Sequence, residues 1–508
     1  MIGSRIFQDL NGEGKSFLKG LSLIGGECGF PGVVDVKNGK IVRIKPLHYD
    51  WQYNRKEFNP WKIEARGQIF EPAMKTLLSP FGLAYKKRVY SSNRVLYPLK
   101  RVDWDPDGER NTANRGKSRY VRISWNEAVD IIAGELKRIK DQYGPEAVLS
   151  QADLHGEGKI VNTTHGCANK LLSLLGGYTI QMRNPDSWEG WVWGAKHAWG
   201  MEELGEMQPS GNLIPDIAEN TNLLLFWGCD PEVTPWGVTG QLPSRLCYWF
   251  KDLGLKSIYI CPDLNYGAAV HADKWIPILP NTDAALQLAI AYVWMTEGTY
   301  DKEYVATHTY GYEQFAEYVL GQEDGIPKTP AWAAPKCGIG EWTIKALARD
   351  WAKKRTTIAH GNGGPAIRSA YATEPARLEV ILLAMQGLGK PGVHQAKMIE
   401  WMGSSGANAM PAGKISPRMP KFAETLRPVA GVAQQQADVL SLFTTGKPGS
   451  KLEKVLTPTP IGSIQFIPKN LIPDAILYPP ISWYGNSSFV GSADEQFVRH
   501  TYPAAGRS

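Results

Sequence analysis

The chain has 508 residues, too many for one hydrophobic core, and its 43% hydrophobic and 21% charged residues are ordinary for a globular protein. The formal net charge is only +6, and lysines and arginines are scattered along the chain, which argues against a nucleic-acid-binding surface. We therefore expect a globular protein of two to four domains without a nucleic-acid partner.

Membrane, secretion and disulfide signals are also lacking. Residues 1–20 contain Asp9 and Glu13 and have no continuous apolar stretch, which argues against a signal peptide. The most apolar run elsewhere, residues 284–295, is interrupted by Gln287 and is too short to cross a bilayer. The six cysteines are widely separated and form no Cys-x-x-Cys pair; they lie at positions 28, 167, 229, 247, 261 and 337. Their spacing therefore indicates neither a zinc site nor a disulfide framework. We expect a cytoplasmic protein with no membrane contact.

Local signals predict a hairpin and a long helix in the first third of the chain. Residues 33–44 alternate in polarity on both sides of Asn38-Gly39, the strongest short signal for a hairpin turn. Ser124 and Glu127 have the spacing of a capping box and predict the start of a helix. This helix should end near Gly144, and apolar residues recur along one of its faces at Val129, Ile132, Leu136 and Ile139.

Residues 155–200 indicate a bound group, because they combine histidines, tryptophans, glycines and an Asp-Ser pair in one short stretch. His155 follows the apolar residues 147–149, a predicted strand, and open α/β sheets bind their ligands at the carboxyl ends of strands. Asp186 and Ser187 follow a turn at Asn184-Pro185. Each residue also has a plainer interpretation: a partly buried structural histidine, a helix cap at Ser187, and core packing for Trp188.

The stretch from residue 222 predicts a nucleotide-binding unit. Residues 222–226 read as a buried parallel strand followed by the turn 227–231, and a second strand, 257–261, ends just before Asp263. Residues 275–283 then lead into a helix. A glycine lets the backbone approach a pyrophosphate, an acid at a strand end can bind ribose hydroxyls, and a second acid can pair with the amino face of guanine.

The plainer interpretation of this unit is a generic Rossmann-like fold, since GxGxxG is absent. Gly228 to Pro231 would then be a simple turn, Asp263 a strand-end cap and Asp283 an acid in the first turn of a helix. A weaker second copy of strand, aromatic residue, glycine and polar turn occurs at 481–488, although any strand and turn can end in this way. Between the copies, 356–359 predicts another strand, followed by a glycine-rich loop.

Three motifs resemble one family specifically. HGEGK at 155–159, HGCANKLLSLLGG at 165–177 and NPDSWEGWVWG at 184–194 are similar to segments of the pyrogallol–phloroglucinol transhydroxylase family, in the dimethyl sulfoxide reductase superfamily of molybdenum enzymes. The resemblance covers nearly the whole chain.

The resemblance implies a role for each candidate residue. Ser187 would ligate molybdenum that two molybdopterin guanine dinucleotides also hold, His155 and Asp186 would be the acid/base pair beside the substrate, and Trp188 would line the pocket. The cofactors would be bound by Gly228, Cys229, Asp230, Pro231, Asp263 and Asp283 and, in the second copy, by Gly485, Asn486 and Ser487. Tungsten would be held by the same ligand set.

The fold implied is α/β, with interleaved Rossmann-like parallel-sheet domains and a small N-terminal β domain. Residues 1–59 would form the small β domain, 60–182 the first half of an α/β domain, 183–345 an inserted cofactor-binding α/β domain, and 346–508 the incomplete second half. Only Cys28 remains of the four cysteines that hold an iron–sulfur cluster in the superfamily, so we expect no cluster in this chain. The C-terminal β-barrel domain of the family would be absent.

The implied activity is transfer of a hydroxyl from a tetrahydroxybenzene to pyrogallol, leaving phloroglucinol, with a small ferredoxin-like iron–sulfur subunit as partner. Two alternatives stay open. One is a reductase or dehydroxylase of the same superfamily that acts on another phenol and requires external electrons. The other is an inactive scaffold fragment without cofactor, which metal content would identify.

Overall fold

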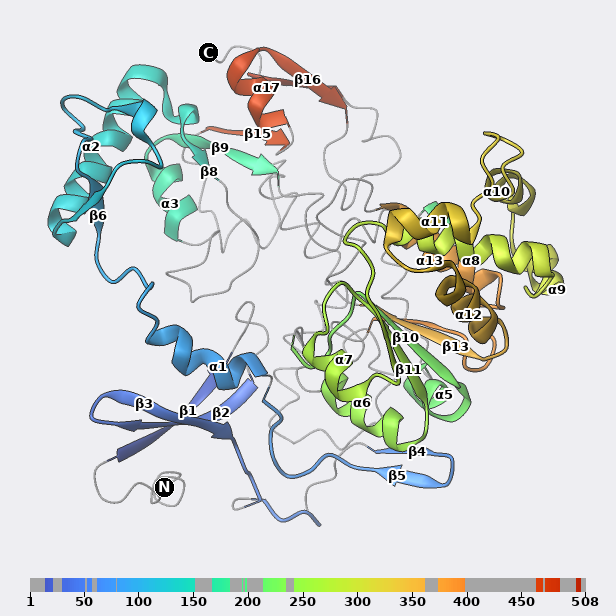
Figure 1. Cartoon of the computed structure of the whole chain (residues 1–508). Helices are drawn as coiled ribbons and strands as arrows, with labels where there is room; N and C mark the ends of the chain where they lie inside the picture. Colours follow the sequence, from blue (N-terminus) through green and yellow to red (C-terminus); the bar gives the residue numbers. More distant parts are fainter. Residues whose placement is uncertain are drawn as a thin grey trace, which may run out of the picture. The chain divides into compact units, whose positions relative to one another are not determined.

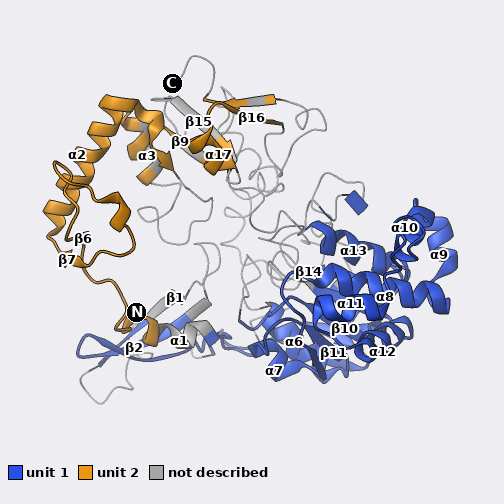
Figure 2. Ribbon diagram, turned by 45° about the horizontal axis from the view of Figure 1, so that its top comes forward, with its two compact units in different colours: residues 1–83, 184–437, 488–490 blue, residues 84–183, 438–487, 491–508 orange. Residues whose placement is uncertain are grey.

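The computed structural model describes residues 14–21, 30–50, 53–56, 62–78, 80–150, 167–182, 194, 197–198, 213–233, 242–360, 373–397, 463–468, 471–484 and 499–503. The chain divides into two compact units, each discontinuous in sequence (Figure 2). Unit 1 comprises Met1–Leu83, Asn184–Ala437 and Ser488–Val490, and unit 2 comprises Ala84–Arg183, Asp438–Ser487 and Gly491–Ser508. The boundary at residue 83 falls inside helix α1, Pro80–Val89.

Unit 1 begins with a three-stranded antiparallel sheet of β1 (Gly14–Leu21), β2 (Phe30–Lys37) and β3 (Lys40–Pro46). The predicted hairpin is confirmed: Asn38 and Gly39 lie at φ 50° and 72°, as a tight turn between twisted strands requires. Asp35 is buried in this sheet and accepts hydrogen bonds from Ser16 Oγ (2.6 Å) and Arg43 Nε (2.7 Å). A short second hairpin follows, β4 (Ile63–Ala65) and β5 (Gln68–Phe70).

The larger part of unit 1 is a parallel sheet in the order β12-β11-β10-β13-β14. Figure 1 labels three of its strands, β11, β10 and β13. Its strands are β10 (Leu223–Trp227), β11 (Lys256–Ile260), β12 (Lys274–Ile276), β13 (Thr356–His360) and β14 (Gln395–Lys397). The chain builds β10, β11 and β12 in one direction and then returns to place β13 on the other side of β10. This reversal between β10 and β13 is a topological switch point, where open α/β sheets bind ligands.

The predicted strands at 222–226, 257–261 and 356–359 are confirmed within one residue at each end. We expected the inserted domain to end at residue 345. The same sheet also contains a strand beyond that residue, since β13 pairs directly with β10. The division into domains itself stays a prediction.

Both faces of this sheet are covered. Leu223, Leu225 and Trp227 join one buried cluster, whereas Leu224 and Phe226 join the other, because successive strand residues point to opposite faces. The first cluster packs against α8 (Asp283–Glu297), α11 (Pro330–Cys337), α12 (Glu341–Ala352) and α13 (Thr373–Ala384). The second packs against α5 (Leu213–Asn220), α6 (Leu242–Asp252) and α7 (Tyr266–His271).

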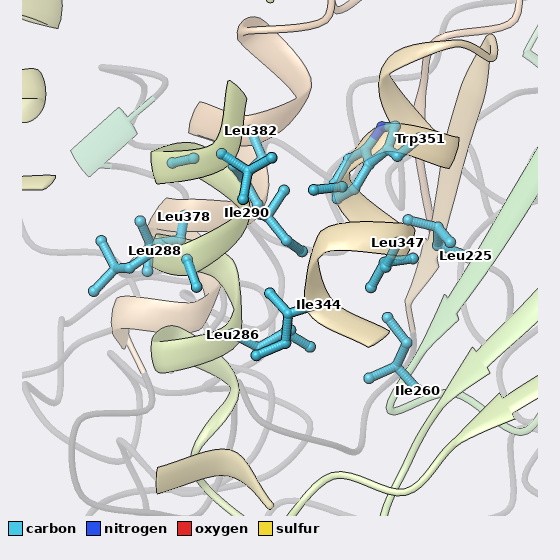
Figure 3. Packing of buried hydrophobic residues seen from close by; sticks show 14 of the residues in the cluster. Leu225, Ile260, Leu286, Leu288, Ile290, Ile344, Leu347, Trp351, Leu378 and Leu382 are labelled. Carbon is cyan, nitrogen blue, oxygen red and sulfur yellow. The ribbon is translucent and has the colours of Figure 1, made fainter. Parts of the chain in front are cut away.

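The first cluster is the larger core (Figure 3). Ile344, Leu347 and Trp351 project from α12 toward α8 and the sheet. The rings of Trp294 and Trp351 meet edge to face at 4.9 Å, and Trp294 Nε1 donates to the carbonyl of Ala348 (2.7 Å). Helices α9 (Lys302–His308) and α10 (Tyr312–Val319) continue from this side of the unit. The core thus fixes α8, whose first residue is Asp283.

Unit 2 contains the predicted long helix, α2 (Trp125–Tyr143), and the Ser124 hydroxyl accepts from the Glu127 amide (3.1 Å), which is the N-cap half of the predicted capping box. Val129 and Ile132 share the predicted apolar face, but each is 58% exposed. A hydrophobic face is buried only where another element covers it, and α2 has no buried residue among those described.

A parallel sheet of unit 2, ordered β15-β9-β8, joins residues distant in sequence. It pairs β8 (Leu149–Ser150) and β15 (Ser463–Pro468) with β9 (Gly177–Met182), which follows α3 (Cys167–Leu174). The remaining elements are β6 (Leu99–Arg101), β7 (Tyr120–Arg122), α17 (Ile472–Leu477), β16 (Ile481–Tyr484), β17 (Arg499–Tyr502) and the 3₁₀ turns Thr112–Asn114 and Pro145–Ala147.

The strand expected at the second copy of the nucleotide pattern is present as β16, yet its pairing differs from that of β10. It lies antiparallel to β17 in a two-stranded sheet, whereas β10 is the centre of a parallel one. Across the described ranges of both units, none of the helices has the length and apolar character needed to span a membrane.

Leu225 tests how far the parallel sheet depends on its buried central strand. Its side chain is fully buried, so Leu225→Ala should lower the free energy of unfolding by about 3 kcal/mol through lost burial and a residual cavity. Leu264→Ala, at a position that is 56% exposed, is the control and should change it by less than about 0.5 kcal/mol. Urea unfolding followed by tryptophan fluorescence measures both, and equal effects would contradict this account of the core.

Candidate functional site

The candidate site that the structure describes is the carboxyl edge of the parallel sheet in unit 1. Gly228 to Pro231 follow β10, Asp263 follows β11, and Asp283 ends the connection from β12 to α8. Because parallel strands end at the same edge, the topology brings these three segments to one side of the sheet, as the nucleotide-binding interpretation expects. The remaining predicted residues, His155, Asp186, Ser187, Trp188, Gly485, Asn486 and Ser487, lie outside the described residues.

Gly228 turns the chain away from β10. Its φ is 58°, a conformation that favours glycine, and its amide donates to the carbonyl of Ile260 (2.9 Å). The next residue, Cys229, is buried among the apolar residues beneath the sheet, and burial holds the pKa of its thiol well above the usual range. The turn therefore offers a ligand its backbone, with the cysteine side chain directed into the core.

Asp230 closes the turn instead of facing outward. Its Oδ1 accepts from the amides of Glu232 (3.0 Å) and Val233 (3.1 Å), and its Oδ2 accepts from the amide of Gly267 in α7 (3.3 Å). Burial raises the pKa of this carboxyl, although the three amides partly offset that effect. A Cβ at Gly267 would lie 2.7 Å from Asp230 Oδ1, so this close approach needs glycine. Asp230 thus shapes the turn and ties it to α7.

A buried acid–histidine pair beside this turn was missed by the sequence analysis. Glu232 Oε1 and His271 Nε2 are 2.7 Å apart, both residues are buried, and the ring of Tyr248 meets that of His271 edge to face at 4.6 Å. Burial, together with the nearby Glu232 carboxylate, raises the pKa of Tyr248 to about 12. The pair fastens the turn to the end of α7, and no local sequence motif signals a contact between residues 39 positions apart.

Asp263 presents the one exposed carboxylate among these predicted acids. Its backbone carbonyl accepts from Cys261 Sγ (3.2 Å) and from the Asn265 amide (2.9 Å), which fixes the residue at the end of β11. Asn265 in turn caps α7 by accepting from the Ala268 amide (2.8 Å). Among the described residues, no donor contacts the Asp263 carboxylate, so it is available to the hydroxyls of a ligand.

Asp283 is a buried carboxyl held by an indole. It is 3% exposed at the first residue of α8, and Trp227 Nε1 donates to its Oδ1 across 2.8 Å. Burial raises its pKa from 3.8 to about 6, because the charged form is poorly solvated there, while the indole hydrogen bond acts in the opposite direction. A buried acid with a raised pKa at the carboxyl edge of a parallel sheet is a candidate functional position.

The raised pKa of Asp283 predicts how stability depends on pH. The folded protein binds this proton more tightly than the unfolded chain, so the free energy of unfolding should fall between about pH 4 and pH 6 and then level off. Two pKa units correspond to about 3 kcal/mol. Asp283→Asn keeps an acceptor for Trp227 and should therefore raise the free energy of unfolding by about 2–3 kcal/mol at pH 7, with little change at pH 4.

The matched control is Asp263→Asn, since its carboxylate is exposed at the same edge of the sheet. It should alter stability by less than about 0.5 kcal/mol at either pH. Urea unfolding of the three proteins at pH 4, 5.5 and 7 makes the comparison, and a gain for Asp283→Asn that is independent of pH would exclude ionisation as its cause.

Two family models and one close relative match this chain. Residues 31–88 match the model described as "Pyrogallol hydroxytransferase large subunit-like, domain 1", and residues 94–502 match "Molybdopterin oxidoreductase". The pyrogallol hydroxytransferase large subunit of Pelobacter acidigallici is 37% identical over 502 residues, which cover 96% of this chain and 55% of that protein.

Reductases are among the more distant relatives. Trimethylamine-N-oxide reductase of Haemophilus influenzae is 30% identical, with 65% of this chain and 40% of the relative covered. Dimethyl sulfoxide/trimethylamine N-oxide reductase of Rhodobacter capsulatus is 29% identical, with 64% and 43% covered. Among solved structures, acetylene hydratase from Pelobacter acetylenicus has a TM-score of 0.39 and 24% identity, covering 72% of this chain and 43% of that one.

The chain spans about half the length of these curated relatives. The match over residues 94–502 nevertheless covers most of the 508 residues, including every predicted site residue. The chain therefore belongs to the molybdopterin oxidoreductase family.

Proposed function

We propose that this chain is the cofactor-binding part of a molybdenum transhydroxylase that converts pyrogallol to phloroglucinol with a tetrahydroxybenzene cosubstrate. One observation carries the proposal: the 37% identity to the pyrogallol hydroxytransferase large subunit extends over 96% of this chain. Membership of the family implies molybdenum and molybdopterin as cofactors. The reaction is assigned to the whole protein, because this chain matches about half of its relative.

The cofactor form that we propose is molybdopterin guanine dinucleotide, two per chain. The described residues fit the nucleotide end of one such molecule, with a glycine turn at Gly228, an exposed carboxylate at Asp263 and a buried one at Asp283, all at the carboxyl edge of a parallel sheet. Cys229 to Pro231 would contribute backbone atoms. Gly485, Asn486 and Ser487 would bind the second molecule after β16.

The bound cofactor would supply a metal centre that can act as a Lewis acid and exchange electrons. We assign Ser187 as its protein ligand, since an alkoxide suits a high-valent metal that prefers oxygen donors. His155 and Asp186 would exchange protons with phenolic hydroxyls near neutral pH, a task for which a histidine beside a carboxylate is suited. Trp188 would form part of the wall against the aromatic ring of the substrate.

The partner that we propose is a small ferredoxin-like iron–sulfur subunit. The relative from Pelobacter acidigallici is named a large subunit, which supports a smaller companion. Within this chain, one cysteine at position 28 cannot hold an iron–sulfur cluster, so the cluster would be carried by the partner. A phenolic substrate and this assembly would meet in the cytoplasm.

A second candidate function is supported by the reductases that match at 29–30% identity. In that case the chain would reduce or dehydroxylate another phenol and would need external electrons. Transhydroxylation needs none in net terms, because the hydroxyl gained by one ring is lost by the other. Turnover of pyrogallol and a tetrahydroxybenzene without any added reductant would therefore distinguish the two.

Metal and pterin analysis tests the cofactor assignment. The chain, purified alone and coexpressed with its proposed small subunit, should contain molybdenum or tungsten and about two guanine nucleotides, the number of cofactors expected for this family. Ser187→Ala should change the coordination of the metal seen by X-ray absorption, and Ser187→Cys should replace an oxygen ligand with sulfur. Ser91→Ala, at an exposed turn, is the control and should leave the spectrum unchanged. If neither preparation contains pterin, the cofactor assignment is wrong and the chain is an inactive scaffold fragment.

The proposed acid/base pair gives a separate kinetic test. His155→Gln and Asp186→Asn should each lower kcat by about 10²–10⁴-fold, the usual contribution of a positioned proton-transfer group, with metal content retained. His308→Gln, at an exposed position of α9, should leave kcat unchanged. Assays of pyrogallol conversion across pH 5–9 measure this, and a full-rate His155→Gln enzyme would remove His155 from the mechanism.

A further inference from the structure

We infer that Trp227 is a positioning residue for guanine recognition: its indole N–H orients the Asp283 carboxylate to accept the N1–H and the 2-amino group of the base. This inference rests on the proposed guanine form of the cofactor. Trp227 would not contact the base itself; it would act through Asp283, which does.

The geometry fixes the indole before any ligand binds. Trp227 is the last residue of β10, it is 2% exposed, and it pairs in parallel register with Ile260 on one side and His360 on the other. Its ring belongs to the cluster that also contains Leu286 of α8. The Nε1–H group therefore points toward Asp283 Oδ1, which lies 2.8 Å away. This hydrogen bond lies at the switch point of the sheet.

The carboxylate keeps enough acceptor capacity for the base. Its two oxygens provide about four acceptor sites, of which the indole uses one on Oδ1 and the backbone amide of Asp283 uses at most one more. Guanine presents two adjacent donors, N1–H and the 2-amino group, which match the two oxygens of a carboxylate. Hypoxanthine has the shape of guanine but lacks the 2-amino group. A comparison of the two bases therefore measures the contact of that amino group with Asp283.

Trp227 also affects the charge that Asp283 carries. Burial raises the pKa of Asp283 to about 6, and the indole hydrogen bond is the interaction that lowers it most. Of the elements packed against α8, α11 presents the Cys337 thiol, whose own pKa is raised by burial and which is neutral near pH 7. The described residues of α10, α12 and α13 add no charge that shifts this pKa. Without the indole, Asp283 should thus be protonated nearer neutral pH and lose acceptor capacity.

The chain offers a matched control in Trp275. It too lies in a strand of this sheet, β12, and its Nε1 donates across 3.0 Å, but the acceptor is the backbone carbonyl of Cys261. Trp227→Phe and Trp275→Phe each remove one indole donor and keep an aromatic ring. Only Trp227→Phe should change guanine recognition.

The experiment measures GDP and IDP binding from pH 5 to 9, using the full chain from a host that cannot make molybdopterin. The natural chain should bind GDP at least about tenfold more tightly than IDP above pH 6 and lose this preference as the pH falls through about 6, as for a hydrogen bond to a charged group. Trp227→Phe should move the midpoint upward by about one to two pH units and regain the preference near pH 8.5. Trp275→Phe should leave the midpoint in place, and Asp283→Asn should abolish the preference throughout.

The outcomes separate the inference from the proposed function. If the natural chain and Asp283→Asn bind GDP and IDP alike, the guanine site itself is wrong and the role of Trp227 is wrong with it. If Asp283→Asn loses the preference but Trp227→Phe keeps the natural midpoint, or weakens both nucleotides equally at every pH, the guanine site stands and the role of Trp227 is overturned.

A measurement on the natural chain covers the case in which Trp227→Phe does not fold. With ¹⁵N-labelled tryptophan, one indole N–H resonance should titrate with the same midpoint as the GDP preference and should stop titrating in Asp283→Asn. The absence of such a resonance would overturn the inference without any substitution at Trp227.

Discussion

The burial of one strand determines most of what surrounds it. Every residue of β10 is buried, so both of its faces must be covered, and the alternation of side chains sends Leu225 into one helical layer and Phe226 into the other. Neighbouring strands satisfy its backbone in parallel register on both sides. A strand in this position ends at the shared carboxyl edge of the sheet, and the turn after it is therefore the natural place for a ligand.

Three acids at that edge show how one residue type serves different ends. Asp230 is surrounded by backbone amides and acts on its own turn. Asp263 keeps an exposed carboxylate. Asp283 is buried and accepts from the indole of Trp227, and its raised pKa means that its ionised form costs stability at neutral pH. The environment, and not the side chain, separates a structural acid from one suited to a ligand.

The proposed chemistry depends on two kinds of support. The nucleotide end of the cofactor would bind at the described edge of the sheet, whereas the proposed roles of Ser187, His155 and Asp186 rest on motifs that resemble those of the transhydroxylase family. Both sets of residues lie within the family match over residues 94–502.

Local interactions were predictable from the sequence, since they depend on residues a few positions apart. The Asn38-Gly39 turn, the Ser124 cap of α2 and the buried strands β10, β11 and β13 follow from backbone conformation, side-chain reach and uninterrupted hydrophobicity, and the structure has each of them. The motifs also sufficed to predict the family. Only the tertiary structure decided that β13 returns beside β10, that β16 pairs antiparallel with β17, and that Trp227 donates to Asp283, 56 positions further along the chain. Contacts of this range form when the whole chain buries its apolar surface, and no short pattern of residues encodes which buried donor will meet which acid.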